Sequence, residues 1–278
     1  MLSRIRSHRA VALLCLALFS IAAFAQDAEK PFEPRTGLPG KDVIWWPTEL
    51  VLINKMLALA KVGPGDVVAD LGSGDGRTVI AAARRGARGI GVELNPDLVK
   101  LSRSNAQKEG VADHTRFLVQ DLFEFDLSQA NVITLFLLQS INMRLRPRIL
   151  DLKPGTQVIS NTFHMDDWQY DEMVRDESKI ANCVLNCVAY LYVVPAKVAG
   201  TWQLPGGEIR LEQRFQMLSG TMSANGNTMA VAGRMRGDQI TLTADGVEFT
   251  GRVVGPHMGG TLKINGEQHG WRATRIGN

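Results

Sequence analysis

The residues best suited to chemistry stand in one short run, Asp70-Leu71-Gly72-Ser73-Gly74-Asp75-Gly76, between an apolar stretch and a helical pattern. Glycine has no Cβ, so this loop can turn sharply and let its backbone approach a ligand closely. The spacing G-x-G-x-G differs from the G-x-G-x-x-G of nicotinamide and flavin proteins, and no Lys-Ser/Thr pair follows as in a nucleotide P-loop. The carboxylates of Asp70 and Asp75 would repel a pyrophosphate. The run therefore indicates a cofactor without phosphates.

Two further acids stand at the ends of neighbouring predicted strands, Glu93 at the end of the run 89–94 and Asp121 directly after the run 115–120. A carboxylate at the end of the second strand can accept hydrogen bonds from both ribose hydroxyls of an adenosine, each worth ~1.5–3 kcal/mol. Asp121 is placed to accept a hydrogen bond from an adenine amino group. Because open α/β sheets bind ligands at the carboxyl ends of their strands, we expect these acids to share one site with Asp70.

These residues carry a resemblance to a known family. The strings DLGSGDGR, GVELNP and QDLF resemble the class I S-adenosylmethionine-dependent methyltransferases, and more narrowly the small ATP-synthase c-subunit-type lysine methyltransferases and their bacterial relatives. The similarity covers about residues 44–170. It implies S-adenosyl-L-methionine as the cofactor and a methyltransferase that acts on a protein, at lysine. The cofactor-binding residues that it implies are Asp70, Gly72, Ser73, Gly74, Gly76, Glu93 and Asp121.

No catalytic residue is assigned, because methyl transfer needs alignment and a deprotonated nucleophile, and no side chain stands out as a general base. Families that methylate adenine or glutamine amides carry Asn/Asp-Pro-Pro-Tyr/Phe after the fourth strand, where this chain reads Leu137-Leu138-Gln139-Ser140. Trp46, Thr48, Gln139 and Asn161 fall where a target channel opens in this fold, but packing, capping or turn roles are favoured for each. The scattered histidines lack metal-ligand spacing, so no metal site is expected.

Strand and helix patterns alternate through the first half of the chain. The strand candidates are 67–71, 89–94, 115–120, 131–138 and 156–163, and the helical patterns are 76–86, 96–109 and 141–151. This alternation predicts an α/β fold with a parallel sheet and helices on both faces. By the resemblance it is a Rossmann-like class I methyltransferase sheet.

Three more segments flank this pattern. A helix that opens at Thr48 and Glu49 is expected to turn one apolar face inward, formed by Leu50, Ile53, Leu57 and Ala60. The segments 168–178 and 183–194 look like strands without a long helix between them. They predict an antiparallel pair at the sheet edge.

The sequence pattern changes after Pro195. From residue 200 to 276 short alternating runs are cut by turn signals such as Asp245-Gly246 and Asn265-Gly266, which predict seven or eight strands. Within them Ile209, Leu211, Phe215 and Met217 are expected to share one face. Such a series fits an all-β meander or small barrel domain that must curl or close to protect its edges.

The first 25 residues form a predicted signal peptide. Arg4, Arg6 and Arg9 precede an uncharged run that ends in the small-x-small sequence Ala23-Phe24-Ala25. The run would span ~22 Å as a helix, short of a ~30 Å bilayer core, so we expect cleavage near Ala25 rather than an anchor. The predicted location is periplasmic or secreted. The predicted domains are 1–25 signal, 26–44 extended linker, 45–195 cofactor-binding domain and 200–278 all-β domain.

Removing the signal leaves 28 basic residues of the 31, against 28 acidic residues, so the mature chain has no basic footprint for nucleic acid. The two cysteines that remain, Cys183 and Cys187, would lie ~13 Å apart along one strand, beyond disulfide reach. We therefore expect two small half-buried side chains, although a turn between them would permit a bridge.

Two alternatives to protein methylation stay open. One is an exported cofactor- or ligand-binding protein without methyl transfer, because S-adenosylmethionine is made in the cytoplasm. The other is a small-molecule methyltransferase with the β domain as a lid. The sequence leaves the acceptor and the oligomeric state undefined.

Overall fold

The computed structural model describes residues 32–37, 39–40, 44–178, 185–224, 226–264 and 266–277. The predicted signal peptide at 1–25 and much of the predicted linker at 26–44 lie outside these residues. The chain from Pro34 onward forms one compact unit. In the part of it that the structure describes, no helix has both the length and the apolarity needed to cross a membrane.

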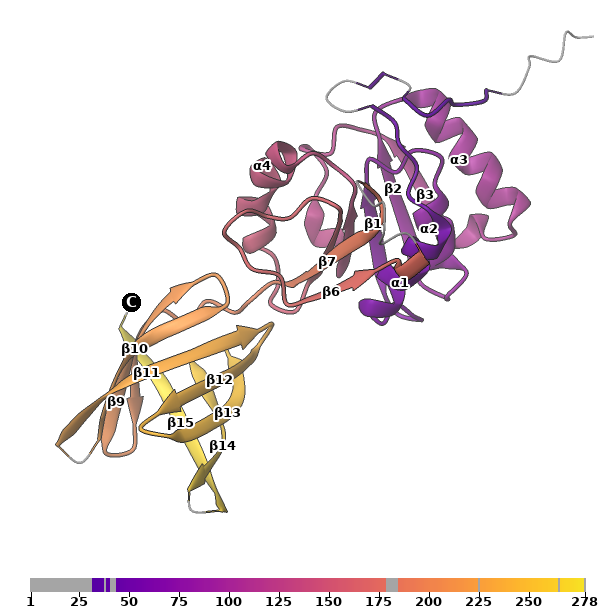
Figure 1. The fold of residues 1–278 in the computed structure, drawn as a ribbon. Helices are drawn as coiled ribbons and strands as arrows, with labels where there is room; N and C mark the ends of the chain where they lie inside the picture. Colours follow the sequence, from indigo (N-terminus) through magenta and orange to yellow (C-terminus); the bar gives the residue numbers. More distant parts are fainter. Residues whose placement is uncertain are drawn as a thin grey trace, which may run out of the picture. The chain divides into compact units, whose positions relative to one another are not determined.

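A seven-stranded sheet forms the first half of this unit, with the strand order β3-β2-β1-β4-β5-β7-β6 (Figure 1). The five parallel strands are β1 (Val67–Leu71), β2 (Arg88–Glu93), β3 (Thr115–Val119), β4 (Val132–Leu135) and β5 (Gln157–Asn161). The last two, β6 (Glu172–Arg175) and β7 (Val188–Val193), run antiparallel to each other, and β6 forms the edge as the sequence predicts. The α/β prediction is confirmed.

Helices cover both faces of this sheet. They are α1 (Leu50–Leu59), α2 (Arg77–Ala83), α3 (Pro96–Lys108) and α4 (Gln139–Leu150), with short 3-10 turns at Ala112–His114 and Leu127–Gln129. Because strand side chains alternate, Val68 joins the core under α1 whereas Ala69 and Leu71 join the core under α4. The strand order changes direction at β1, which has β2 on one side and β4 on the other. The loop between β1 and α2 therefore lies at the carboxyl ends of the strands, where open α/β sheets bind ligands.

The buried face of α1 differs from the prediction at one residue. Ile53 and Leu57 are fully buried and Ala60 is nearly so, but Leu50 is 56% exposed. Leu52 and Met56 complete the buried face instead. The sheet against which α1 packs determines which side of the helix is buried. The spacing of apolar residues in the sequence was compatible with two overlapping buried faces.

The expectation of two unbridged cysteines is wrong for Cys187, which is disulfide-bonded. The reach argument assumed one continuous strand, but β7 begins only at Val188, and residues 185–187 form a bend. Cys183 and the signal-segment Cys15 lie outside the described residues. Cys187 itself is 4% exposed.

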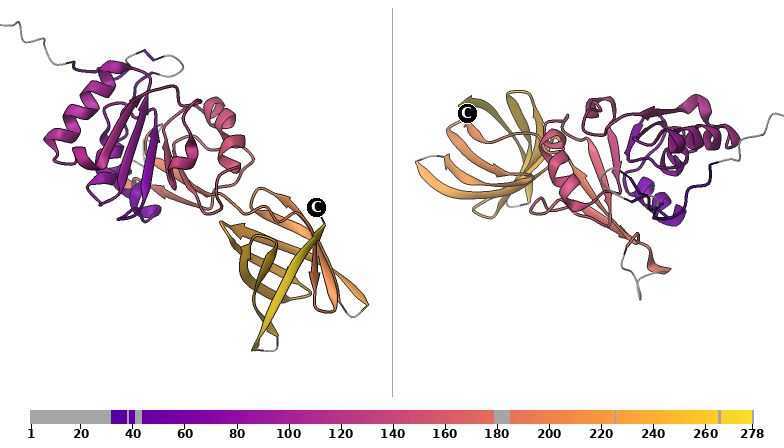
Figure 2. Two further views of the ribbon diagram at one scale, coloured as in Figure 1. Left: turned by 180° about the vertical axis from the view of Figure 1, so that it is seen from behind. Right: turned by 90° about the horizontal axis from the view of Figure 1, so that it is seen from above.

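The C-terminal part of the chain, residues 200–277, is a closed eight-stranded antiparallel barrel (Figure 2). Its strands are β8 (Gly200–Leu204), β9 (Gly207–Arg214), β10 (Met217–Ala224), β11 (Asn227–Arg236), β12 (Gln239–Ala244), β13 (Val247–Val254), β14 (His257–Ile264) and β15 (Glu267–Gly277). Each predicted turn joins two of them. β15 pairs with β8, so the meander closes and no edge is left.

The barrel interior is a packed side-chain core that includes Trp202, Ile209, Leu211 and Leu242. Two of the four residues predicted to share one face do not follow the strand pattern. Met217 is 43% exposed, and Phe215 stands in the β9–β10 turn with a left-handed φ of 53°. The turn interrupts the alternation that joined these residues to Ile209 and Leu211 in the sequence.

Candidate functional site

The glycine loop is anchored to the end of β2. The backbone N–H groups of Gly72 and Ser73 both donate to the carbonyl of Val92, over 2.8 and 3.1 Å. The hydroxyl of Ser102, on α3, donates to the carbonyl of Gly74 over 2.8 Å. These bonds fix the loop between β1 and α2 against the end of β2 and against α3.

Glycine is required at two positions for different reasons. Gly74 has a φ of 54°, and a Cβ there would come within 2.5 Å of Nε1 of Trp45. Gly76 has a φ of 82°, and a Cβ there would lie 2.8 Å from Phe117 and from Ser102. Both conformations disfavour other residues, and both sites are crowded. Gly74 thus keeps the loop close to Trp45, and Gly76 lets α2 pack on the sheet.

Glu93 binds the loop through its carboxylate. Oε2 accepts the N–H of Gly74 at 3.0 Å, and Oε1 accepts the N–H groups of Leu94 and Asn95 at 2.9 Å each. A carboxylate offers about four acceptor sites, so capacity remains for a ligand hydroxyl. Glu93 is therefore both a support of the glycine loop and a candidate ligand acceptor.

Asp70 is a buried acid, with 8% of its surface exposed. Burial raises the pKa of its carboxyl to about 7, and the nearby Glu93 and Asp75 carboxylates add to the rise. Hydrogen bonds from Thr134 and Thr78 oppose the shift, and the Thr134 Oγ1 to Asp70 Oδ1 distance is 2.6 Å. The site thus holds a carboxylate that favours a positively charged ligand group nearby.

The third predicted acid, Asp121, follows β3 and accepts the N–H of Phe123 over 2.9 Å. It lines the same cavity as Asp70 and Glu93. Gly72, Ser73 and Gly74 line this cavity too, whereas Gly76 lies behind the loop at the N-terminus of α2. The structure therefore brings six of the seven predicted residues together around one cavity.

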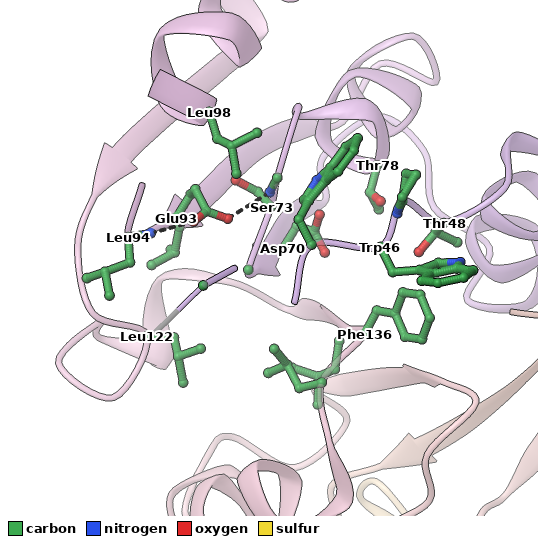
Figure 3. Close-up of a pocket in the computed structure, with 18 of the residues that line it drawn as sticks. Trp46, Thr48, Asp70, Ser73, Thr78, Glu93, Leu94, Leu98, Leu122 and Phe136 are labelled. Atoms are coloured by element: carbon green, nitrogen blue, oxygen red, sulfur yellow. Dashed lines mark hydrogen bonds between the residues drawn. The ribbon is translucent and has the colours of Figure 1, made fainter. Parts of the chain in front are cut away.

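This cavity has a volume of about 450 Å³ and two chemically different ends (Figure 3). Glu93, Leu94 and Leu98 lie at one end, which we call the acidic end, with Asp70 and Ser73 in the middle. Trp46, Thr48 and Phe136 gather at the other, which we call the aromatic end. A cavity of this size accommodates a small cofactor, and the aromatic end gives an apolar approach to it.

The aromatic end is built largely by residues 44–49, which we call the strap. Trp45 lies against the glycine loop, and Trp46 is 45% exposed at the cavity. The guanidinium of Arg77 donates to the carbonyl of Thr48 over 3.2 Å while it pairs with the carboxylate of Asp75. Arg77 thereby ties the strap to the glycine loop.

The four positions suggested for a target channel separate in the structure. Trp46 and Thr48 line the cavity, whereas Gln139 begins α4 and Asn161 is buried behind the strap, and neither lines it. Three aromatic residues that also line it were not predicted from the sequence: Trp45, Phe136 and Phe163. The neighbouring Trp46-Pro47-Thr48 could have signalled Trp45, whereas nothing local marks Phe163.

One buried side chain at the site, Ser73, has unmet hydrogen-bonding capacity. Ser73 is 4% exposed, lines the cavity, and its Oγ has no hydrogen-bond partner within the described chain. Such a group is rarely left unsatisfied in a folded protein, so it is a candidate ligand contact. No three His, Cys, Asp or Glu side chains of the described ranges gather closely enough to hold a metal ion.

Comparison with known sequences places the chain among methyltransferases. Residues 70–172 match the family model described as the ANTKMT methyltransferase domain. A protein-lysine N-methyltransferase from Saccharolobus islandicus is 37% identical over 151 residues, which are 53% of this chain and 91% of that protein. The lysine N-methyltransferase of the ATP-synthase c-subunit from Xenopus laevis is 35% identical over 164 residues, 59% of this chain and 66% of the frog protein.

A solved structure agrees with these sequence matches. The crystal structure of an RNA methyltransferase from Salinibacter ruber in complex with S-adenosyl-L-homocysteine is 46% identical, with a TM-score of 0.51. The match covers 55% of this chain and 96% of that one. That chain is thus matched almost whole, with the product form of a methyl-donor cofactor bound to it.

Proposed function

Because this chain belongs to the S-adenosylmethionine-dependent methyltransferases, in the family that contains the protein-lysine N-methyltransferases, we propose that it methylates lysine side chains of a protein. The observation that carries the proposal is the single cavity that joins an acidic end to an aromatic end. An adenosine cofactor suits the first end. An alkyl amine suits the second.

The cofactor is S-adenosyl-L-methionine, and the residues present fit it. The unpartnered Ser73 hydroxyl and the spare acceptor capacity of Glu93 offer bonds to a polar ligand. The loop from Asp70 to Gly76 contains no lysine or arginine that could bind a phosphate, which agrees with a cofactor without phosphates. When bound, this cofactor supplies an electrophilic methyl group on a sulfonium.

We assign the acids to separate parts of the cofactor. Glu93 accepts the ribose hydroxyls, and Asp121 accepts the adenine amino group. Asp70 stands near the cationic methionine end, where a positive charge stabilises its carboxylate against burial. Ser73 donates to or accepts from the same end. All four residues line the same cavity, which supports these roles.

The aromatic end serves the acceptor. Trp46 and Phe136 offer apolar faces that pack along the methylene stem of a lysine side chain, and aromatic faces attract the cationic methylated product. Apolar surroundings also disfavour the charged amine, so the lysine reaches the methyl group without its proton, which it leaves in water. This accounts for transfer without a general base from the protein.

We further propose that the protein acts outside the cytoplasm, in the periplasm or as a secreted protein. The basic and apolar segment at 1–25 supports export. The disulfide at Cys187 supports it as well, because disulfides persist in oxidising compartments. N-terminal sequencing of protein recovered from the envelope tests this, since a mature start near Gln26 is expected.

The function is tested in two stages with mature protein. Calorimetry with S-adenosylmethionine and S-adenosylhomocysteine should detect binding, and Glu93→Ala should weaken it at least tenfold. Glu248→Ala on the exposed face of β13 is the matched control and should bind as wild type. Absence of binding at millimolar cofactor would contradict the assignment.

The second stage identifies the acceptor. Envelope extract is incubated with methyl-labelled cofactor, then treated with protease or with RNase, and the hydrolysate is analysed for methyl-lysine. Label that survives RNase, is lost to protease and elutes as methyl-lysine supports the proposal. Because one similar structure is that of an RNA methyltransferase, label lost to RNase would transfer the assignment to RNA.

A further inference from the structure

The strap is held by a buried pair of asparagines that does not itself line the cavity. Nδ2 of Asn186 donates to the carbonyl of Pro47 over 3.0 Å. Nδ2 of Asn161, at the end of β5, donates to the hydroxyl of Thr48 over 3.2 Å. Two side chains from separate segments therefore grip consecutive residues of the strap.

The two asparagines also bind each other. Nδ2 of Asn161 donates to Oδ1 of Asn186 over 2.8 Å, and the hydroxyl of Thr162 donates to Oδ1 of Asn161 over 2.9 Å. Asn161 is fully buried and Asn186 is 4% exposed. In such surroundings a satisfied hydrogen-bond network is strong and holds its members in one arrangement. The pair is a rigid support for the strap.

The backbone at Asn186 is held in place as well. Its φ of 66° is left-handed, a conformation that asparagine tolerates better than most residues. Its N–H donates to the hydroxyl of Thr162 over 2.8 Å, and the next residue, Cys187, is disulfide-bonded. The position of the Asn186 amide is thereby set by its own backbone, by Thr162 and by the neighbouring disulfide.

We propose that Asn161 and Asn186 are positioning residues for the methyl acceptor: together they hold the strap so that Trp46 forms a fixed wall of the aromatic end. The proposal rests on the proposed function for the identity of the acceptor. The pair acts through Pro47 and Thr48. Trp46 directly precedes these two residues, and α1 begins shortly after them, at Leu50. Without the pair, Trp46 is no longer held in position. Neither asparagine contacts the acidic end, so cofactor binding there is retained.

The main variant is Asn186→Gly, which keeps the left-handed backbone and removes both side-chain bonds. The second variant, Thr48→Val, removes only the acceptor of the Asn161 bond and preserves shape. The matched control is Gln157→Ala. It removes a β5–α1 bond at the far end of both elements, where Nε2 donates to the carbonyl of Ala60 over 3.1 Å.

Fluorine NMR of 5-fluorotryptophan-labelled protein reports the wall directly, with the Trp46 signal assigned by Trp46→Phe. In Asn186→Gly this signal should shift or broaden. The initial rate of methyl transfer to envelope extract should fall about tenfold, because a misplaced acceptor loses its alignment. The affinity for S-adenosylhomocysteine should stay within twofold. Thr48→Val should show the same pattern more weakly, and Gln157→Ala none of it.

An unchanged Trp46 signal and rate in Asn186→Gly would overturn the proposal, as would equal losses in Gln157→Ala. If Asn186→Gly does not fold, Thr48→Val carries the test by the same criteria. Failure of the proposed function is distinguishable. In that case wild type binds cofactor and labels no protein, while the Trp46 signal still reports whether the pair holds the strap.

Discussion

Thr134 on β4 lies opposite Asp70 on β1 in the parallel register, and its hydroxyl donates to Oδ1 of that carboxylate over 2.6 Å. This bond and the one from Thr78 only partly offset the burial of Asp70, whose pKa is raised to about 7. The carboxylate is thus poorly stabilised until a cation joins it. In the cofactor-free protein, ionisation of Asp70 should therefore lower the free energy of unfolding.

The first prediction concerns stability and pH. The folded pKa of Asp70 lies above its ordinary value of 3.8, so the folded state binds the proton more tightly and its free energy of unfolding falls as pH rises from about 4 to 7. Asp70→Asn cannot ionise. Between pH 5 and 8, cofactor-free wild type should lose about 3 kcal/mol relative to Asp70→Asn in urea unfolding. Parallel pH profiles for the two proteins would contradict this.

The second prediction concerns cofactor affinity and pH. Since the ionised carboxylate of Asp70 is the form that attracts the cationic methionine end, affinity for S-adenosylmethionine should fall by up to about tenfold for each pH unit below 7. Calorimetry in two buffers of different ionisation enthalpy should detect proton release below pH 7. Asp70→Asn should bind more weakly and without this release. Release that persists in Asp70→Asn would assign the proton to another group.

The third prediction separates crowding from backbone strain in the glycine loop. Gly74→Ala places a methyl group against Trp45, whereas Gly110→Ala has a similar φ of 68° and open space around its Cβ. Both should lose about 1–2 kcal/mol of stability from the left-handed backbone. Only Gly74→Ala should weaken S-adenosylhomocysteine binding, at least tenfold. Equal affinities in calorimetry would mean that the approach of Trp45 is not needed.

The fourth prediction tests the domain division near residues 195–200. Leu242 on β12 is fully buried in the barrel core, and Leu242→Ala should destabilise the barrel by about 2–5 kcal/mol. The neighbouring Thr241→Ala is exposed and serves as control. If the two halves fold separately, calorimetric melting of Leu242→Ala should show one transition lowered and cofactor affinity unchanged. Loss of cofactor binding together with the barrel would indicate one cooperative unit.

The sequence predicted what is local. Asp70, the three glycines and Glu93 lie within 24 residues, and a strand, a tight turn and a helix suffice to place them. The closure of the barrel was also within reach, because turn residues mark most of its hairpins, although not the β9–β10 turn at Phe215. These features depend on neighbours in the chain.

The aromatic end depends on residues far apart in the chain and was not predicted as a site. The bond between Asn186 and Pro47 spans 139 residues, and Phe163 reaches the cavity from a loop after β5. The exposed Leu50 has the same origin, because the receiving sheet decides which side of α1 is buried. No short-range pattern records such contacts.

The pairing of β15 with β8 has a consequence for biosynthesis. The strand that closes the barrel is the last of the eight to be synthesised, and its partner β8 is the first. Until β15 arrives, β8 and β14 each present an open row of N–H and C=O groups, which invites pairing with another chain. A nonsense codon before Glu267 should therefore yield aggregates rather than a smaller barrel, and the nascent barrel is most vulnerable until β15 has been synthesised.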